Sequence, residues 1–124
     1  MLKLFFVFIG GGMGSLFRYL ISQLPIFEKS LFPIKTLCIN MIGCFLIGLL
    51  LAFIEKRIIT NDELRLLLIT GFCGGFTTFS TFANESKLLI SSGHWLISIS
   101  YIILSILLGI SFVFAGKQMA GHIL

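Results

Sequence analysis

Charged residues are scarce in this sequence. Only 11% of the 124 residues are Asp, Glu, Lys or Arg, whereas 57% are hydrophobic. A water-soluble domain of this length needs a polar shell around a modest core, and the chain has too few polar residues to make one. The scarcity excludes a soluble globular protein and indicates that lipid covers most of the surface.

The groups that carry enzymatic chemistry are equally scarce. The two histidines, His94 and His122, and the three cysteines form no Ser–His–acid set, no Cys–His pair and no cluster with metal-ligand spacing. Of the five acids, four fall in expected loops or at the ends of apolar segments: Glu28, Glu55, Asp62 and Glu63. We therefore do not expect an enzyme.

No run of basic residues is present either, although the net charge is +4. The nine Lys and Arg residues are scattered along the chain. Basic side chains beside membrane segments usually contact lipid phosphates or extend to the interface. The sequence therefore predicts contact with a lipid bilayer and no nucleic acid partner.

What the sequence does contain is four long apolar blocks, at residues 4–24, 33–54, 64–90 and 95–115. Each is long enough to cross a hydrocarbon core of roughly 30 Å as a helix of about 20 residues. Helices are the open-chain structure that satisfies backbone groups in lipid. We expect residues 1–124 to form a single all-α domain of four transmembrane helices, multi-pass in the cell (inner or plasma) membrane.

The positive charges are divided almost evenly between the two sides of the membrane. With four spans, both termini and the central connection lie on one side and the two outer connections on the other. The first side carries five Lys or Arg residues: Lys3, Lys56, Arg57, Arg65 and Lys117. The second side carries four: Arg18, Lys29, Lys35 and Lys87. Because an excess of these residues in short loops normally fixes orientation, the balance predicts insertion both ways and an antiparallel dimer. The alternative is that lipids or a partner chain fix one orientation.

Polar or ionisable residues inside a membrane span are costly, so they mark where function is expected. In the first block, Gly10 and Gly14 are small residues four apart, which permits another helix to approach closely. Arg18 follows near the far end of this block. Its guanidinium either extends to the interface or anchors an anion at the mouth of a pore.

The second block carries a polar face. Thr36, Asn40 and Gly43 follow one another at steps of four and three, so they share one side of a helix. The Asn40 carboxamide has two donor hydrogens and one acceptor oxygen. It either bonds a neighbouring helix or offers an N–H to a passing anion.

The third block is a poor helix interior. Two adjacent glycines, Gly74 and Gly75, are followed by four Ser or Thr residues within five positions, 77–81. This pattern predicts a break in the helix, which releases carbonyl groups that attract cations. The alternative is a simple kink, with the hydroxyls bonded back to their own helix.

Aromatic and hydroxyl side chains complete the set of candidates. Phe79 and Phe82 lie three residues apart, and although such a pair normally packs, the positive edges of two rings can stabilise a small anion. In the fourth block, Tyr101 and Ser105 are four apart. Their hydroxyls either donate to an anion or bond a neighbouring helix.

Taken in order and spacing, these motifs resemble those of the CrcB/Fluc family of fluoride channels. Two short patterns match at Gly10, Gly11, Gly14, Ser15, Arg18 and Tyr19, and at Thr36, Leu37, Asn40, Gly43, Phe45 and Gly48. The long and highly specific pattern Gly-x-x-Gly-Gly-x-Thr-Thr-Phe-Ser-Thr-Phe matches residues 71–82, and Glu85 follows. The resemblance covers all four blocks. The chain departs from the family at Lys35, where Gly is frequent, and at Cys44, where Ser is frequent.

The resemblance implies a passive, fluoride-selective channel that exports cytoplasmic fluoride. It implies a dual-topology antiparallel dimer, a homodimer or a heterodimer with a related subunit, with two antiparallel pores. Residues implied to line the pore are Asn40, Phe79, Ser80, Phe82, Thr36, Tyr101 and Ser105, and those at the vestibule are Arg18 and Glu85. The backbone carbonyls of Gly74 and Thr77 from both copies are implied to hold a central structural Na⁺.

Two other functions fit parts of the sequence. A small dual-topology multidrug or cation transporter also has four spans, but it requires a membrane-embedded carboxylate. Only Glu85, late in the third block, is a candidate for that role. A non-transporting assembly subunit would need neither the helix break nor the polar donors.

Overall fold

The computed structural model describes residues 1–27 and 29–123, and every regular element in these ranges is helical. Glu28, one of the acids expected in a loop, lies outside them. The elements are α1 (Leu2–Ser22), η1 (Pro25–Phe27), α2 (Ile34–Glu55), α3 (Asp62–Arg65), η2 (Leu66–Cys73), α4 (Gly74–Phe76), α5 (Phe79–Ser91) and α6 (Trp95–Ile123). Elements α3 to α5 form one span from Asp62 to Ser91, so the described residues contain four helices long and apolar enough to cross a membrane. The expected all-α, four-span architecture is confirmed.

Two helix ends differ from the apolar blocks. Helix α1 ends at Ser22 instead of residue 24, because Pro25 disfavours a helical conformation in the residue before it. Helix α6 continues to Ile123 instead of ending at residue 115. Its last turns stay helical because the buried residues Gly116 and Ala120 hold them against the rest of the chain.

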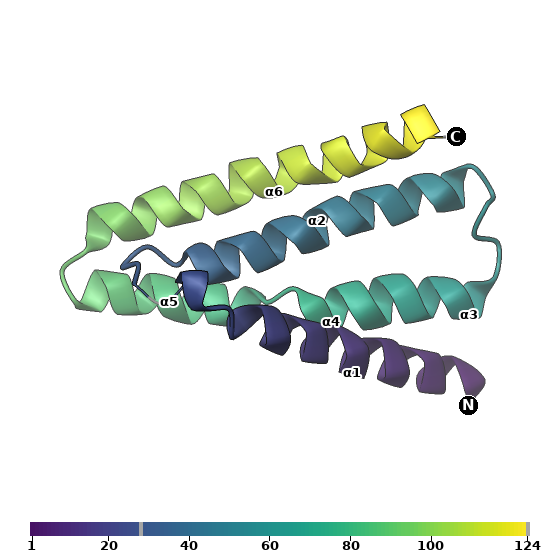
Figure 1. Cartoon of the computed structure of the whole chain (residues 1–124), viewed down its shortest axis with the longest axis horizontal. Coiled ribbons are helices and arrows are strands. Elements are labelled where there is room, and N and C mark those ends of the chain that lie inside the picture. The colour runs from purple at the N-terminus through teal and green to yellow at the C-terminus, as the bar shows by residue number, and fades with distance from the viewer. Residues whose placement is uncertain (28, 124) are drawn as a thin grey trace.

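Both chain termini and the connection between α2 and α3 lie at one end of the bundle (Figure 1). The two outer connections lie at the opposite end. This arrangement agrees with the division of the chain used to count positive charges. At the end with the termini, Lys117 Nζ lies 2.8 Å from Glu55 Oε1 and ties α6 to α2.

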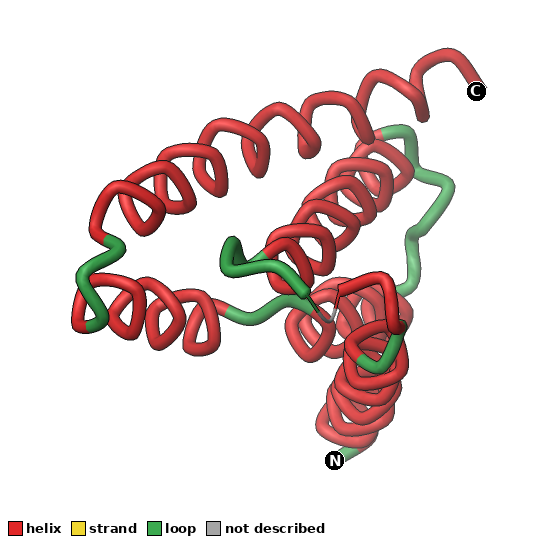
Figure 2. The backbone as a smooth tube through the Cα atoms, turned by 60° about the vertical axis from the view of Figure 1, so that its left-hand side comes forward, coloured by secondary structure: helices red, strands yellow, loops and turns green. Residues whose placement is uncertain are grey.

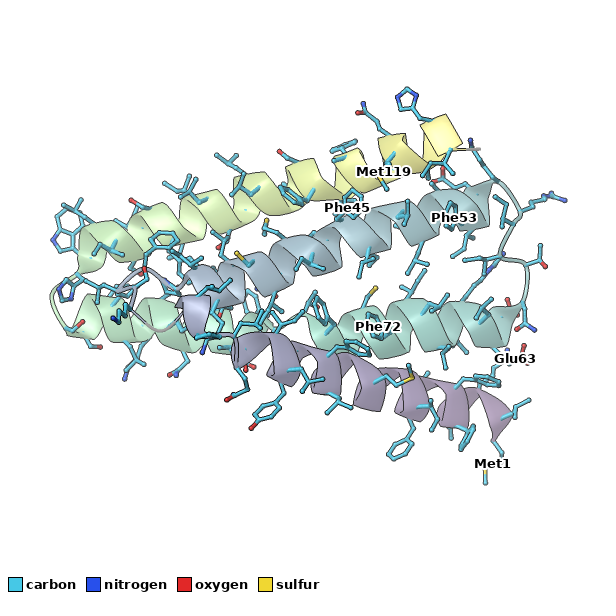
Figure 3. The ribbon with its side chains drawn as sticks, viewed as in Figure 1. Met1, Phe45, Phe53, Glu63, Phe72 and Met119 are labelled. Atoms are coloured by element: carbon cyan, nitrogen blue, oxygen red, sulfur yellow. The ribbon has the colours of Figure 1, made fainter. Side chains whose placement is uncertain are left out.

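Glycines bring α1 against the first half of the third span. Gly10 faces the backbone of Leu67 and Gly71, and Gly14 faces the backbone of Phe72. Phe72 lies where the third span meets α1 (Figure 3), and its ring centroid is 5.9 Å from that of Phe17. The small residues expected to admit another helix therefore admit one from the same chain.

A second glycine contact joins α2 and α6, which lie side by side along most of their length (Figure 1). Gly48 of α2 faces the backbone of Val113, and Gly116 of α6 faces the backbone of Phe45. A Cβ atom at either glycine would overlap backbone atoms of the other helix. Close backbone approach thus organises the four spans as two tightly packed pairs.

The third span is interrupted at Thr77 and Thr78, where a short loop separates its two helical parts (Figure 2). The ψ angles of these residues are 159° and 112°, which is extended backbone. Helix α5 begins after Thr78, whose Oγ1 accepts a hydrogen bond from the N–H of Thr81 at 3.2 Å. The expected break is therefore confirmed, but Gly74 and Gly75 remain helical and the chain opens just after them.

Candidate functional site

The break is held by one side chain of α2. Asn40 Nδ2 donates to the carbonyl of Thr78 at 3.2 Å, and Asn40 Oδ1 accepts from the N–H of Thr78 at 2.9 Å. The carboxamide thus takes the place of both helical partners of Thr78. Of the two roles open to Asn40, the interhelical hydrogen bond is present, and the amide retains a second N–H that these two bonds do not use.

Replacing Asn40 with Leu is expected to destabilise the fold. Two backbone groups of Thr78 would lose their partner inside an apolar bundle, at a cost of about 1–3 kcal/mol each. Unfolding of the purified protein in detergent, followed by circular dichroism, measures the effect. The control is Ile42→Ala, at an exposed position of the same helix, which should change stability little. Equal stability of both variants would contradict the role of Asn40.

The backbone carbonyls of Gly74 and Thr77 are among those that lose their helical donors at the break. In an uninterrupted helix, the carbonyl of Gly74 would accept from the N–H of Thr78, and that of Thr77 from the N–H of Thr81. Here the N–H of Thr78 donates to Asn40, and the N–H of Thr81 donates to the side chain of Thr78. The carbonyl oxygens of Gly74 and Thr77 thereby lose these hydrogen bonds and can serve as ligands to a cation.

An open groove of about 430 Å³ runs beside the break, between α2, the third span and α6. We call it the apolar groove, because most of its lining is apolar and none of its lining residues is charged. It brings together six of the predicted site residues: Asn40, Gly74, Thr77, Phe79, Phe82 and Ser105. These residues are separated by up to 65 positions in the sequence, and the fold gathers them along one path.

The two phenylalanines at this groove differ in their surroundings. The Phe79 side chain is 79% exposed, so little of the chain covers it. Its ring centroid lies 5.7 Å from that of Phe82, with the ring planes tilted by 45°. Phe82 also contacts Tyr101 in a T-shaped pair at 5.1 Å. Phe82 is therefore anchored within the chain, whereas Phe79 projects away from it.

Two serines predicted to line a pore also differ. Ser105 Oγ is buried beside the groove and has no hydrogen-bond partner within residues 1–27 and 29–123. A buried hydroxyl without a partner costs free energy, so a ligand that accepts its hydrogen would be favoured here. Ser80 is exposed in the first turn of α5 and is not among the residues that line the groove.

The remaining hydroxyls meet a carboxylate. Thr36 Oγ1 donates to Glu85 Oε1 at 2.7 Å, and the Tyr101 hydroxyl donates to Glu85 Oε2 at 2.9 Å. Thr36 and Tyr101 are only 3% and 0% exposed. Of the two roles open to Tyr101, the bond to a neighbouring helix is therefore present. This cluster joins α2, α5 and α6 and satisfies both oxygens of Glu85.

A second hollow of about 400 Å³ lies between α1, α2 and α5, near the end of the bundle with the outer connections. We call it the polar pocket. Arg18, Lys35 and Glu85 line it, and Thr78 borders both this pocket and the apolar groove. The expected vestibule residues Arg18 and Glu85 thus lie together, next to the break.

Comparison with known proteins places this arrangement in a family. A family model described as "CrcB-like protein, Camphor Resistance (CrcB)" matches residues 5–117. The chain belongs to the CrcB family. With its four membrane-crossing helices, this CrcB-family chain is a multi-pass membrane protein.

Curated relatives of the CrcB family are similar to the chain over almost their whole length. A protein of Bacteroides fragilis is 48% identical over 124 residues, which cover 96% of each sequence. One of Gloeothece citriformis is 43% identical over 117 residues (94% of each), and one of Flavobacterium psychrophilum is 41% identical over 121 residues (97% of this chain and 98% of the relative). All three are named fluoride-specific ion channel FluC. A channel is not an enzyme, so the expectation that this chain is not one is confirmed.

Sequence reasoning missed three residues that shape the break in this CrcB-family chain. Thr78 caps α5 and pairs its hydroxyl with that of Thr81 at 2.9 Å. Ser15 of α1 donates to the carbonyl of Gly75 at 3.4 Å. The signal for the cap was available, because Thr is a favoured residue immediately before a helix. The contact of Ser15 depends on how α1 packs, which no local pattern indicates.

Proposed function

We propose that this chain is a passive, fluoride-selective channel that exports fluoride from the cytoplasm. The observation that carries the proposal is the composition of the apolar groove: aromatic rings, an amide N–H and a buried hydroxyl border one path without any charged side chain. The names of the relatives support the same ion. Fluoride would pass Phe79 and Phe82 along their ring edges, with Asn40 and Ser105 as donors.

The chemistry of fluoride suits this lining. Fluoride is small and tightly hydrated, so a pore must replace its water with donors that do not hold the ion too firmly. Ring edges and neutral N–H or O–H groups carry partial positive charge, whereas a full positive charge would trap the ion. Neutral HF enters a cell across lipid and ionises at the internal pH. A passive channel then lets the membrane potential drive the anion out.

The groove requires a second copy to become a closed pathway. It is open along one side, and the exposed Phe79 ring projects from the chain at this groove. We propose that an inverted copy covers it, as the even division of positive charge favours, so that the dimer contains two antiparallel pores. The partner is either the same chain or a related subunit.

The released carbonyls of Gly74 and Thr77 would hold a structural Na⁺ between the two copies. Hard cations prefer oxygen ligands, and these carbonyls have lost their helical donors to other partners. Two carbonyls from one chain leave a cation incompletely coordinated, and the same pair from the inverted copy would complete a cage. The bound ion would supply positive charge that holds the broken spans together.

The rival transporter function depends on Glu85. Both oxygens of this carboxyl group accept hydrogen bonds from buried hydroxyls, so a bulky cation would have to displace these hydroxyls in order to bind it. Proton-coupled uptake of a cationic dye into vesicles would support the rival. We expect none.

The proposal is tested with vesicles that contain only this purified chain. Loaded with potassium fluoride and treated with a potassium ionophore, they should release fluoride rapidly to an ion-selective electrode. The same vesicles loaded with potassium chloride should retain chloride. Retention of fluoride, or equal release of both halides, would contradict a fluoride-selective channel.

A further inference from the structure

The polar pocket contains more positive charge than the residues around it neutralise. Arg18 and Lys35 both line it, each half-buried, and neither forms an ion pair within the described part of the chain. The one acid in the lining, Glu85, directs its two oxygens to the hydroxyls of Thr36 and Tyr101. The pocket therefore presents a net positive field to its opening.

Lys35 is a positively charged residue at the N-terminal end of a helix, a position that does not favour helix stability. It lies in the first turn of α2, which begins at Ile34. The helix dipole makes a cation in the first turn of a helix unfavourable. The same dipole adds positive potential to the pocket, so the charge of Lys35 and the end of α2 act in the same direction.

The pocket also leads toward the ion pathway. Thr78 borders both the polar pocket and the apolar groove, and its backbone is held by Asn40. An anion drawn into the pocket is thus brought next to the break. Walls of low dielectric around a hollow of one sign concentrate ions of the opposite sign and raise the rate of entry.

We infer that Lys35, together with Arg18, draws fluoride from dilute solution into the polar pocket and so sets the rate at which the ion reaches the pathway. Lys35 is a steering residue here and not part of the narrow path, because it does not line the apolar groove. The inference rests on the proposed channel function and adds one residue-specific property to it: a dependence of the rate on ionic strength.

The experiment compares Lys35→Met with the unaltered chain in vesicles at two ionic strengths, set with a large inert anion. At about 10 mM salt, where charges act over about 30 Å, the variant should release dilute fluoride about two- to fivefold more slowly. At about 1 M salt, where the range is about 3 Å, the two rates should agree. Agreement at high salt also shows that the variant is folded.

Two further variants isolate the charge. Lys35→Arg keeps it and should conduct as the unaltered chain does at both ionic strengths. Lys87→Met removes a charge from an exposed position of α5 outside the pocket and should slow release less than Lys35→Met does. Equal rates for Lys35→Met and the unaltered chain at low salt, or a deficit that persists at high salt, would overturn the inference while the channel function stands. Absence of fluoride release from the unaltered chain would overturn both.

Discussion

Vesicles that contain the Phe79→Ile variant should release fluoride no faster than vesicles without protein. Isoleucine fills similar space but has no positive ring edge to replace water around the ion. Because the Phe79 side chain is largely exposed, its loss removes few packing contacts within the chain. We expect a fall in rate of more than about hundredfold, equivalent to about 2.7 kcal/mol in the barrier, measured with a fluoride electrode.

The matched control is Phe8→Ile. Phe8 is 76% exposed, much as Phe79 is, but it lies on α1 away from the apolar groove. This variant should conduct at the unaltered rate, which separates an effect of the pathway from an effect of a missing surface aromatic. Equal conduction by the two variants would contradict the prediction that the Phe79 ring lines the fluoride pathway.

The second large effect is expected from Gly14→Ala. The added Cβ would overlap the carbonyl oxygen of Phe72 and lie 2.8 Å from the amide nitrogen of Phe76. Backbone atoms yield only if α1 separates from the third span, and Phe76 directly precedes the break. Such overpacking costs about 1–3 kcal/mol, occasionally more. The variant should show a lower melting temperature in detergent and a lower yield of active channel.

Gly12 provides a control on the same helix. A Cβ at Gly12 would meet no atom within 4 Å. Gly12→Ala should therefore fold and conduct normally, and it should retain its melting temperature. An equal loss in both variants would show that the specific contact with Phe72 does not explain the effect.

The four spans were predictable because their signal is long and redundant. Each apolar block contains about 20 residues, so a few exceptions do not change the assignment. The partner of each helix was not predictable in this way. Gly10 and Gly14 indicate that some helix comes close, but the identity of that helix depends on the backbone of Leu67 and Phe72, more than 50 residues later.

The position of the break shows the same limit. Local composition predicted a break in the tract that runs from Gly74 and Gly75 through the Ser and Thr residues at 77–81, but not the residue at which the helix opens. The helix continues through the two glycines and opens at Thr77 and Thr78, because Asn40 of another span supplies both backbone partners of Thr78. A hydrogen bond across 38 positions overrides local preference, and no short window contains it.

The sequence predicted which residues belong to the candidate site better than it predicted which partners their side chains contact. The fold gathers Asn40, Phe79, Phe82 and Ser105 at one groove, but it directs the Thr36 and Tyr101 hydroxyls to Glu85. Spacing within one helix cannot show which of several acceptors a hydroxyl will find on another. The pore roles, the Na⁺ cage and the inverted dimer remain predictions, and each has a direct test in purified protein.

The bond between Asn40 and Thr78 also bears on how the protein is made. During synthesis the second span enters the bilayer before the third, so the carboxamide is already in place when Thr78 leaves the translocation machinery. The backbone N–H and carbonyl of Thr78 can then form their hydrogen bonds within the same chain, without a second polypeptide. In the proposed inverted dimer, each copy could therefore fold alone, and the meeting of two oppositely inserted copies would be a later event, set by their abundance and lateral diffusion.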